Sequence, residues 1–209
     1  MAKVGCSAAK PNKAFSPTDA SCKLPDSDLE KLKQLIPPPA QPSSRPTEQD
    51  WIETQARLGL ELPPEWKAFL QTYGAGTFRG SETTALSIYS AGNPSFAEDV
   101  SYELERFREI RGDAPTADYP FRIFPEPAGL YPLGIDECDV WICWKCSGAP
   151  QEWPIAVRWT WGEQGIRTFD LPLSTFLVRL FERTLELPCW PEPTFLDDVK
   201  FVPYPAAAT

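Results

Sequence analysis

The sequence has 209 residues and no histidine, and this absence excludes many kinds of active site. Ser-His-Asp and Cys-His nucleophiles, HExxH zinc sites and the usual imidazole acid–base relay all require a histidine. The sequence also lacks a run of the roughly 20 apolar residues that a membrane-spanning helix needs, and its first residues contain no apolar stretch of the secretory type. We therefore expect a cytoplasmic protein that does not use imidazole chemistry.

Residues 1–46 are poor in large apolar side chains. A single aromatic residue, Phe15, lies there, together with eight of the 24 prolines of the chain. Such a segment buries too little surface to offset the entropy lost on ordering, so we expect a mostly disordered tail. Within this tail, a capping box followed by three prolines predicts one short helix near residues 28–36. We expect a single domain over residues 47–209.

The excess of acidic residues lies in the expected domain rather than in the tail. The formal charge of -9 divides into +3 for residues 1–46 and -12 for residues 47–209. An acidic domain repels the phosphates of nucleic acids and of anionic membranes. No basic stripe overrides this repulsion, since Arg106, Arg108 and Arg111 alternate with glutamates on a predicted solvated helix face. We expect no binding to nucleic acids or membranes, and the charge favours a basic protein as partner.

The six cysteines are too sparse for a disulfide scaffold, so reduced thiols are expected. Cys143 and Cys146 form a CxxC pair, a spacing found in redox sites and in halves of zinc sites. Here the pair lies on a predicted strand rather than at a helix N-terminus, which would lower a thiol's pKa, and a zinc site would lack a clear fourth ligand. We interpret both as structural cysteines, and a thiol enzyme is the alternative.

Capping signals and apolar periodicity predict four helices in the domain. Thr47 and Asp50 form a capping box, Gly59 and Gly74 follow the first two helices as C-terminal glycines, and Asn93 precedes the third. The glycine-rich segment after the second helix is expected to be only a turn. The predicted helices cover residues 47–58, 63–73, 94–111 and 174–185.

Short apolar runs separated by Gly, Pro and Asp predict a meander of strands. They cover residues 83–90, 121–124, 130–134, 140–145, 155–161 and 165–169. Helices and strands are segregated along the chain, which favours an α+β fold. We expect a mainly antiparallel twisted sheet of about five to six strands, with helices packed on one face.

Three carboxylates lie between two of the predicted strands. Their spacing lacks the ligand pattern of a calcium loop, and turn composition favours a hairpin turn with solvated carboxylates. The same meander contains five tryptophans, and alternation along a strand places Trp141 and Trp144 on opposite faces, so some are core and others can be exposed. Exposed tryptophans beside carboxylates are typical of protein-binding surfaces. The candidate partner contacts are Asp136, Glu137, Asp139, Trp141 and Trp161.

Two blocks of residues have a specific spacing. The first spans a predicted helix pair and comprises Leu58, Gly59, Leu62, Pro63, Trp66, Phe69, Leu70, Tyr73, Gly74 and Gly76. The second spans a strand–turn–strand segment and comprises Gly129, Leu133, Gly134, Asp139, Trp144, Gly148, Trp153, Pro154 and Val157. Both blocks resemble the SUKH superfamily, a group of bacterial toxin-immunity proteins related to a fungal cell-wall-synthesis regulator. The resemblance extends over residues 29–185, and Cys138 stands where family members usually carry a glycine.

The resemblance implies an α+β domain with no catalytic site, metal or cofactor, which acts by binding another protein. Bacterial relatives typically bind and neutralise a toxin, often a nuclease, whereas fungal relatives act as regulatory scaffolds. We expect an immunity-type inhibitor whose partner is a basic toxin domain, because the acidic domain would attract it. A regulatory scaffold that recruits proteins through its proline-rich tail is the alternative.

Overall fold

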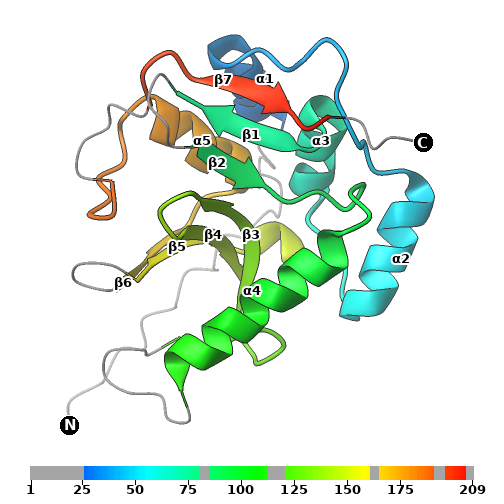
Figure 1. Cartoon of the computed structure of the whole chain (residues 1–209), viewed down its shortest axis with the longest axis vertical. Helices are drawn as coiled ribbons and strands as arrows, with labels where there is room; N and C mark the ends of the chain where they lie inside the picture. Colours follow the sequence, from blue (N-terminus) through cyan, green and yellow to red (C-terminus); the bar gives the residue numbers. More distant parts are fainter. Residues whose placement is uncertain (1–25, 81–84, 113–120, 161–164, 191–195, 206–209) are drawn as a thin grey trace, which may run out of the picture.

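The computed structural model describes residues 26–80, 85–112, 121–160, 165–190 and 196–205 (Figure 1). This part of the chain contains five α-helices and a seven-stranded sheet, so the predicted α+β fold is confirmed. The helices are α1 (Asp26–Leu35), α2 (Glu48–Leu58), α3 (Pro64–Tyr73), α4 (Phe96–Arg111) and α5 (Leu173–Phe181), with a short 3-10 helix at Pro150–Glu152.

All neighbouring strands of the sheet are antiparallel, and their order is β6-β5-β4-β3-β2-β1-β7. Six strands follow one another as a meander, and β7 returns to pair with β1. The strands are β1 (Gly76–Arg79), β2 (Ala85–Ile88), β3 (Leu130–Asp136), β4 (Val140–Lys145), β5 (Ile155–Trp159), β6 (Gly165–Phe169) and β7 (Lys200–Pro203).

The sheet has seven strands rather than the expected five to six, because β1 and β7 were not predicted. The Gly-Ala-Gly sequence before β1 indicated only a turn, and each of these two strands has four residues. Conversely, the strand expected over residues 121–124 is reduced to an isolated bridge between Ile123 and Leu130. A four-residue strand carries little periodicity of its own, so its pairing partners decide whether it forms.

Helices cover both faces of the sheet, whereas the sequence indicated one. Trp144 on β4 packs against Trp66 of α3, with ring centroids 5.2 Å apart. Trp141, on the opposite face of β4, packs against Phe107 of α4 at 5.4 Å. Figure 1 shows α4 in front of β3 and β4, and α5 behind β1 and β2. The long α4 is therefore a second layer over the central strands.

The packed structure includes α1, which lies along α5. Leu29, Leu32 and Ile36 are buried in the same core as the rest of the molecule. The hydroxyl of Tyr73 on α3 donates a hydrogen bond of 2.7 Å to the carbonyl of Ile36. The core therefore extends across the domain boundary expected between residues 46 and 47. Residues 1–25 of the expected tail lie outside the described residues.

The N-terminus of α5 is capped by a side chain from another helix. Pro172 at its N-cap makes no side-chain cap, and the carboxylate of Glu65 on α3 accepts hydrogen bonds from the N–H groups of Leu173, at 3.1 Å, and Ser174. Burial raises the pKa of Glu65, while its hydrogen bonds to Ser174 act in the opposite direction. A carboxylate at this position also suits the positive end of the helix dipole, so Glu65 joins α3 to α5.

The predicted helix ends are confirmed where they depend on local chemistry. Thr47 and Asp50 form the capping box of α2, and Gly59 ends that helix in the left-handed region. Gly74 ends α3 with φ +70°, and there the backbone also makes a close contact. A Cβ on Gly74 would lie 2.2 Å from the carbonyl oxygen of Ser43, which accepts a hydrogen bond from the N–H of Ala75.

The two C-cap glycines give a matched pair of variants. Gly59→Ala places a Cβ in open space, so we expect only the cost of a left-handed alanine, about 1 kcal/mol. Gly74 has ψ -158°, a conformation that essentially only glycine adopts, and a Cβ there also clashes with the Ser43 backbone, so the loss in the free energy of unfolding for Gly74→Ala is expected to be at least about 2 kcal/mol. Urea unfolding of both variants measures the difference. Equal losses would show that neither the Ser43 contact nor the backbone conformation of Gly74 requires a glycine there.

Candidate protein-binding surface

The hairpin turn between β3 and β4 is built on a buried carboxylate. One oxygen of Asp136 accepts hydrogen bonds from the N–H groups of Cys138, at 2.8 Å, and Val140, at 2.9 Å. Its other oxygen accepts the indole N–H of Trp190 at 2.8 Å. Burial raises the pKa of Asp136, and the three hydrogen bonds favour its charged form. Asp136 thus holds the turn from inside and ties it to the segment after α5.

The turn needs no glycine at position 138. The residue in the left-handed region is Asp139, with φ +58°, and an aspartate tolerates this conformation better than most side chains. Cys138 therefore fits the position at which the resemblance described above predicts a glycine. Cys138 is exposed overall, and the partial loss of water around its thiol, together with the neighbouring carboxylates, raises the pKa of that thiol. Such a thiol is protonated at neutral pH and is a weak nucleophile.

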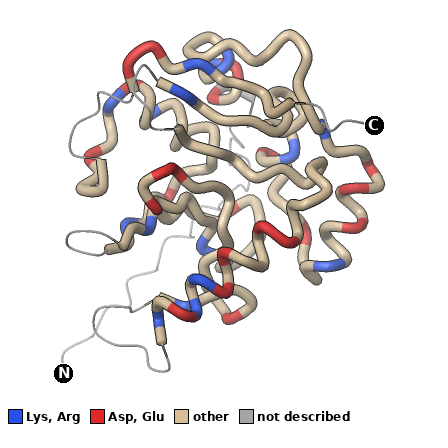
Figure 2. Tube along the Cα trace, in the orientation of Figure 1, with Lys and Arg blue, Asp and Glu red and all other residues tan. Residues whose placement is uncertain are grey.

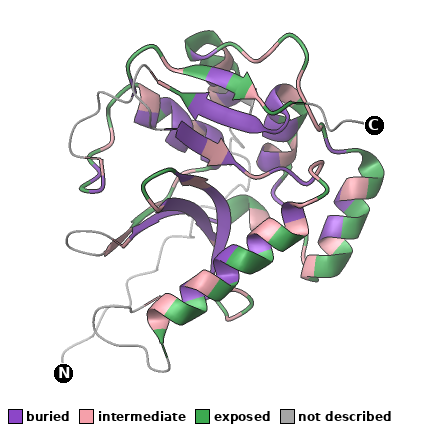
Figure 3. Ribbon diagram, in the orientation of Figure 1, coloured by how far each residue is buried: buried purple, intermediate pink, exposed green. Residues whose placement is uncertain are grey.

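Glu137 and Asp139 are the two predicted contact residues that reach the surface of the turn. Each side chain is 51% exposed. Asp139 accepts a hydrogen bond of 3.0 Å from Arg106 of α4, and Glu137 lies 3.8 Å from Arg79 of β1. Figure 3 shows the turn exposed above strands that are buried, and Figure 2 shows acidic residues at this turn and along α2 and α4. The turn is an acidic tip on a rigid hairpin.

The remaining predicted contact residues are Asp136, Trp141 and Trp161. Trp141 is fully buried and Asp136 is 4% exposed, so both side chains serve the fold and neither offers a partner a surface. The alternation that placed Trp141 and Trp144 on opposite faces is correct, but α4 covers the face where we expected exposure. Trp161 lies outside the described residues. Which of the five residues contact a partner remains a prediction.

A buried carboxylate on α4 organises the side chains behind the turn. Glu103 is 5% exposed and accepts the indole N–H of Trp141 at 2.7 Å. It also accepts the hydroxyl of Tyr89 at 3.4 Å and pairs with Arg106 at 3.3 Å. Arg106 bridges from Glu103 to Asp139 and lies 4.8 Å from the Trp141 ring. The network therefore connects the core tryptophan to the surface carboxylate and fixes α4 relative to the hairpin.

Glu103 was missed by sequence reasoning, which assigned it to the solvated face of its helix. Its spacing does indicate burial: Val100, Glu103, Leu104 and Phe107 follow the i, i+3, i+4, i+7 pattern of one helix face, and all four are buried. The carboxylate is tolerated there because Trp141 and Tyr89 donate hydrogen bonds to it.

A second buried charge lies beside this network. The guanidinium of Arg158 on β5 is 4.7–4.9 Å from the ring centres of Phe107, Phe121 and Trp141, and the residue is 1% exposed. Three aromatic faces around one cation give attractive cation–π interactions that strengthen when water is excluded. Arg158 therefore helps hold α4 and the start of the 121–130 segment against the sheet.

The CxxC thiols are not arranged as reactive groups. Cys143 is fully buried on β4, and burial raises its pKa. Burial also raises the pKa of Cys146 to about 12. Both cysteines are free, as expected of structural cysteines. Within the described residues no cluster of three or more Cys, Asp or Glu could hold a metal ion.

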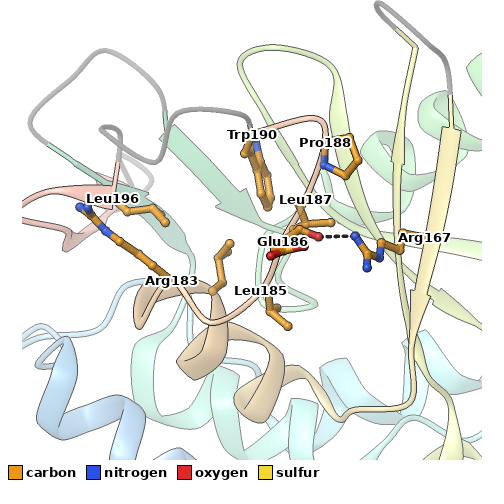
Figure 4. Close-up of a pocket in the computed structure, with 9 residues that line it drawn as sticks. Arg167, Arg183, Leu185, Glu186, Leu187, Pro188, Trp190 and Leu196 are labelled. Atoms are coloured by element: carbon orange, nitrogen blue, oxygen red, sulfur yellow. Dashed lines mark hydrogen bonds between the residues drawn. The ribbon is translucent and has the colours of Figure 1, made fainter.

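The pocket behind the turn is lined by the segment that follows α5 (Figure 4). Its volume is about 360 Å³, and Leu180, Leu187, Trp190 and Leu196 are among the residues that line it. Arg167 on β6 closes it by donating a hydrogen bond to the carbonyl of Glu186. Because Trp190 also binds Asp136, this pocket wall and the acidic turn share one support.

Removing the buried acceptor gives a direct test of the network. Glu103→Leu leaves the N–H of Trp141 and the hydroxyl of Tyr89 without their acceptor, so we expect a loss of about 2–4 kcal/mol in the free energy of unfolding. Glu109→Leu on the exposed side of the same helix is the control, with an expected change below about 0.5 kcal/mol. Urea denaturation measures both, and similar losses would contradict a special role for Glu103.

A comparison with protein families gives one match. The family model described as SMI1-KNR4 cell-wall, of the SUKH group, matches residues 48–169, which is more than half of the chain. The match starts at α2, ends with β6, and includes the β3–β4 turn and α4. No curated protein and no solved structure matches the chain. None of the described helices has the length and apolar content needed to cross a bilayer.

Proposed function

Because the chain belongs to the SMI1-KNR4 cell-wall family of the SUKH group, we propose that it is a non-catalytic, cytoplasmic protein-binding module of the immunity type, which binds and neutralises a toxin. The observation that carries the proposal is the acidic β3–β4 turn, in which Glu137 and Asp139 are exposed on a support fixed by Asp136. A rigid, charged tip loses little conformational entropy when a partner binds it.

Charge supports a basic partner. The chain carries a formal charge of -9, and the turn presents the half-exposed carboxylates of Glu137 and Asp139, although Arg79 and Arg106 lie beside them. An acidic inhibitor attracts a basic protein before contact and so accelerates association, an effect that salt weakens. A nuclease domain is one kind of basic toxin that fits this chemistry, since it must itself attract nucleic acid phosphates.

Identification of the partner is the first test, and the structure determines how to make it. We expect tagged full-length protein to capture one stoichiometric basic protein from its native lysate at low salt. A variant lacking residues 1–25 should capture the same protein, because it retains α1 and with it the core contacts of Leu29, Leu32 and Ile36. Mass spectrometry identifies the bound proteins. Removal of residues 1–46 is unsuitable, since it deletes part of the core.

The alternative function is a regulatory scaffold, which the cell-wall description of the family favours. Under that function the full-length protein captures a set of regulatory or cell-envelope proteins, and deletion of residues 1–25 abolishes the capture. That pattern would replace the toxin-inhibitor proposal, because an inhibitor acts through its folded domain.

Charge reversal at the turn tests the proposed contact surface. Glu137→Lys combined with Asp139→Lys is expected to slow association with the captured partner about tenfold at low salt, because the attractive potential at the tip is lost. Stopped-flow or surface-based kinetics give the rate constant. Glu61→Lys with Glu152→Lys makes the same change in net charge at exposed sites away from the turn and should slow association less. Equal effects of the two double variants would remove the turn from the interface.

A further inference from the structure

The end of the β3–β4 hairpin opposite the acidic turn contains a separate cavity of about 280 Å³. It lies where β3 begins and β4 ends, and β6 forms its outer wall. Its apolar surface comes from Phe121, Leu130 and Ile166, and its polar groups belong to Arg122, Lys145 and Thr168. None of these residues belongs to the turn or to the Glu103 network.

The charge of this cavity is opposite to that of the chain. Arg122 and Lys145 line it, and no carboxylate does. Two other cavities each include an acidic residue, Glu186 in one and Asp198 in the other. A site with two cations and no anion is unexpected on a protein with a formal charge of -9.

The two cations are available to a ligand. Neither Arg122 nor Lys145 forms an ion pair with any residue that the structure describes, whereas Arg106, Arg108 and Arg111 on the neighbouring α4 all do. Among the residues that the structure describes, Arg122 donates only to the carbonyl of Pro127, at 3.3 Å, and most of its guanidinium donors are not used there. A guanidinium and an ammonium together can each donate to one carboxylate.

We propose that this cavity binds a carboxylate that is attached to an apolar group. The anion would lie between Arg122 and Lys145, with the hydroxyl of Thr168 as a further donor, and the apolar group would cover the exposed parts of Phe121 and Ile166. Phe121 and Ile166 are only partly buried, and an inorganic anion would gain nothing from their exposed apolar surface. The volume is close to the lower end of ordinary ligand sites, about 300 Å³, and suits one aromatic or branched side chain.

Two kinds of ligand carry a carboxylate attached to an apolar group: a free organic acid, and a peptide through its C-terminal residue. The site is also distinct from the proposed toxin-binding turn, since Lys145 is the sixth and last residue of β4 after that turn, about 20 Å along the strand. Failure of either site to bind therefore leaves the other unaffected.

Titration of the full chain with chosen probes tests the proposal. The probes are 4-phenylbutyrate, a short peptide ending in Leu with a free carboxylate, the same peptide amidated, acetate and inorganic phosphate. Amide shifts of Lys145, Ile166 and Thr168 in nuclear magnetic resonance spectra locate the binding. We expect saturable shifts with 4-phenylbutyrate or with the free-carboxylate peptide, and at least about tenfold weaker binding of the amidated peptide and of acetate.

Variants separate the cavity from general charge. Arg122→Gln with Lys145→Gln is expected to weaken binding at least about tenfold, while Arg45→Gln with Arg179→Gln removes two other exposed cations and should leave it unchanged. Tighter binding of the peptide than of the free acid identifies a C-terminus as the source, and the reverse identifies a small organic acid. No saturable shift with either carboxylate below about 10 mM, equal binding of acetate or phosphate, or equal effects of the two double variants would overturn the proposal.

Discussion

Trp141 and Trp144 point to opposite faces of the same central strand, and both must be removed from water. Each ring buries about 200 Å² of surface, worth about 5 kcal/mol before entropy is considered. No single layer of helices can cover both. The chain meets this requirement with Trp66 of α3 on one face and Phe107 of α4 on the other. These two contacts place α3 and α4 on opposite faces of the hairpin that carries the acidic turn.

Covering the second face with α4 brings polar atoms into the core, and the structure pairs them. The indole N–H of Trp141 requires an acceptor once it is buried, and Glu103 supplies one. Trp190 and Asp136 repeat the arrangement at the edge of the hairpin. Each tryptophan thus fixes a carboxylate, and each carboxylate fixes the backbone or side chains near the turn. The acidic tip is rigid for the same reason that the core is closed.

The sequence predicts the parts of this fold that depend on neighbouring residues. Thr47 with Asp50 and Gly59 mark the ends of α2 correctly, since a cap is a contact over a few residues. The sequence does not reveal β7, because this strand forms only by pairing Lys200–Pro203 with Gly76–Arg79, which is distant in the sequence. The docking of α1 onto α5 is non-local in the same way, so its apolar stripe indicated a helix but not a position.

The candidate site shows the same division. Turn composition identifies Glu137 and Asp139 as exposed carboxylates, which the structure supports with half-exposed side chains. Asp136 has the same composition but points inward, because the turn's own N–H groups need its oxygens. Strand alternation cannot show which face a helix will cover, so the burial of Trp141 required the structure. The cations of Arg122 and Lys145 meet only through folding, and no spacing in the sequence relates them.

The return of the chain to its own beginning has a consequence for how the protein is made. Asp28 on α1 and Thr175 on α5 share a hydrogen bond and are 147 residues apart. In the same way, β1 can pair with β7 only after the chain near residue 200 has been made. At a synthesis rate of about 5–20 residues per second, the apolar side of α1 stays uncovered for roughly ten seconds or more on the ribosome. Such distant pairing also slows folding once synthesis is complete. During that interval Leu29, Leu32 and Ile36 form an exposed stripe that a chaperone can bind.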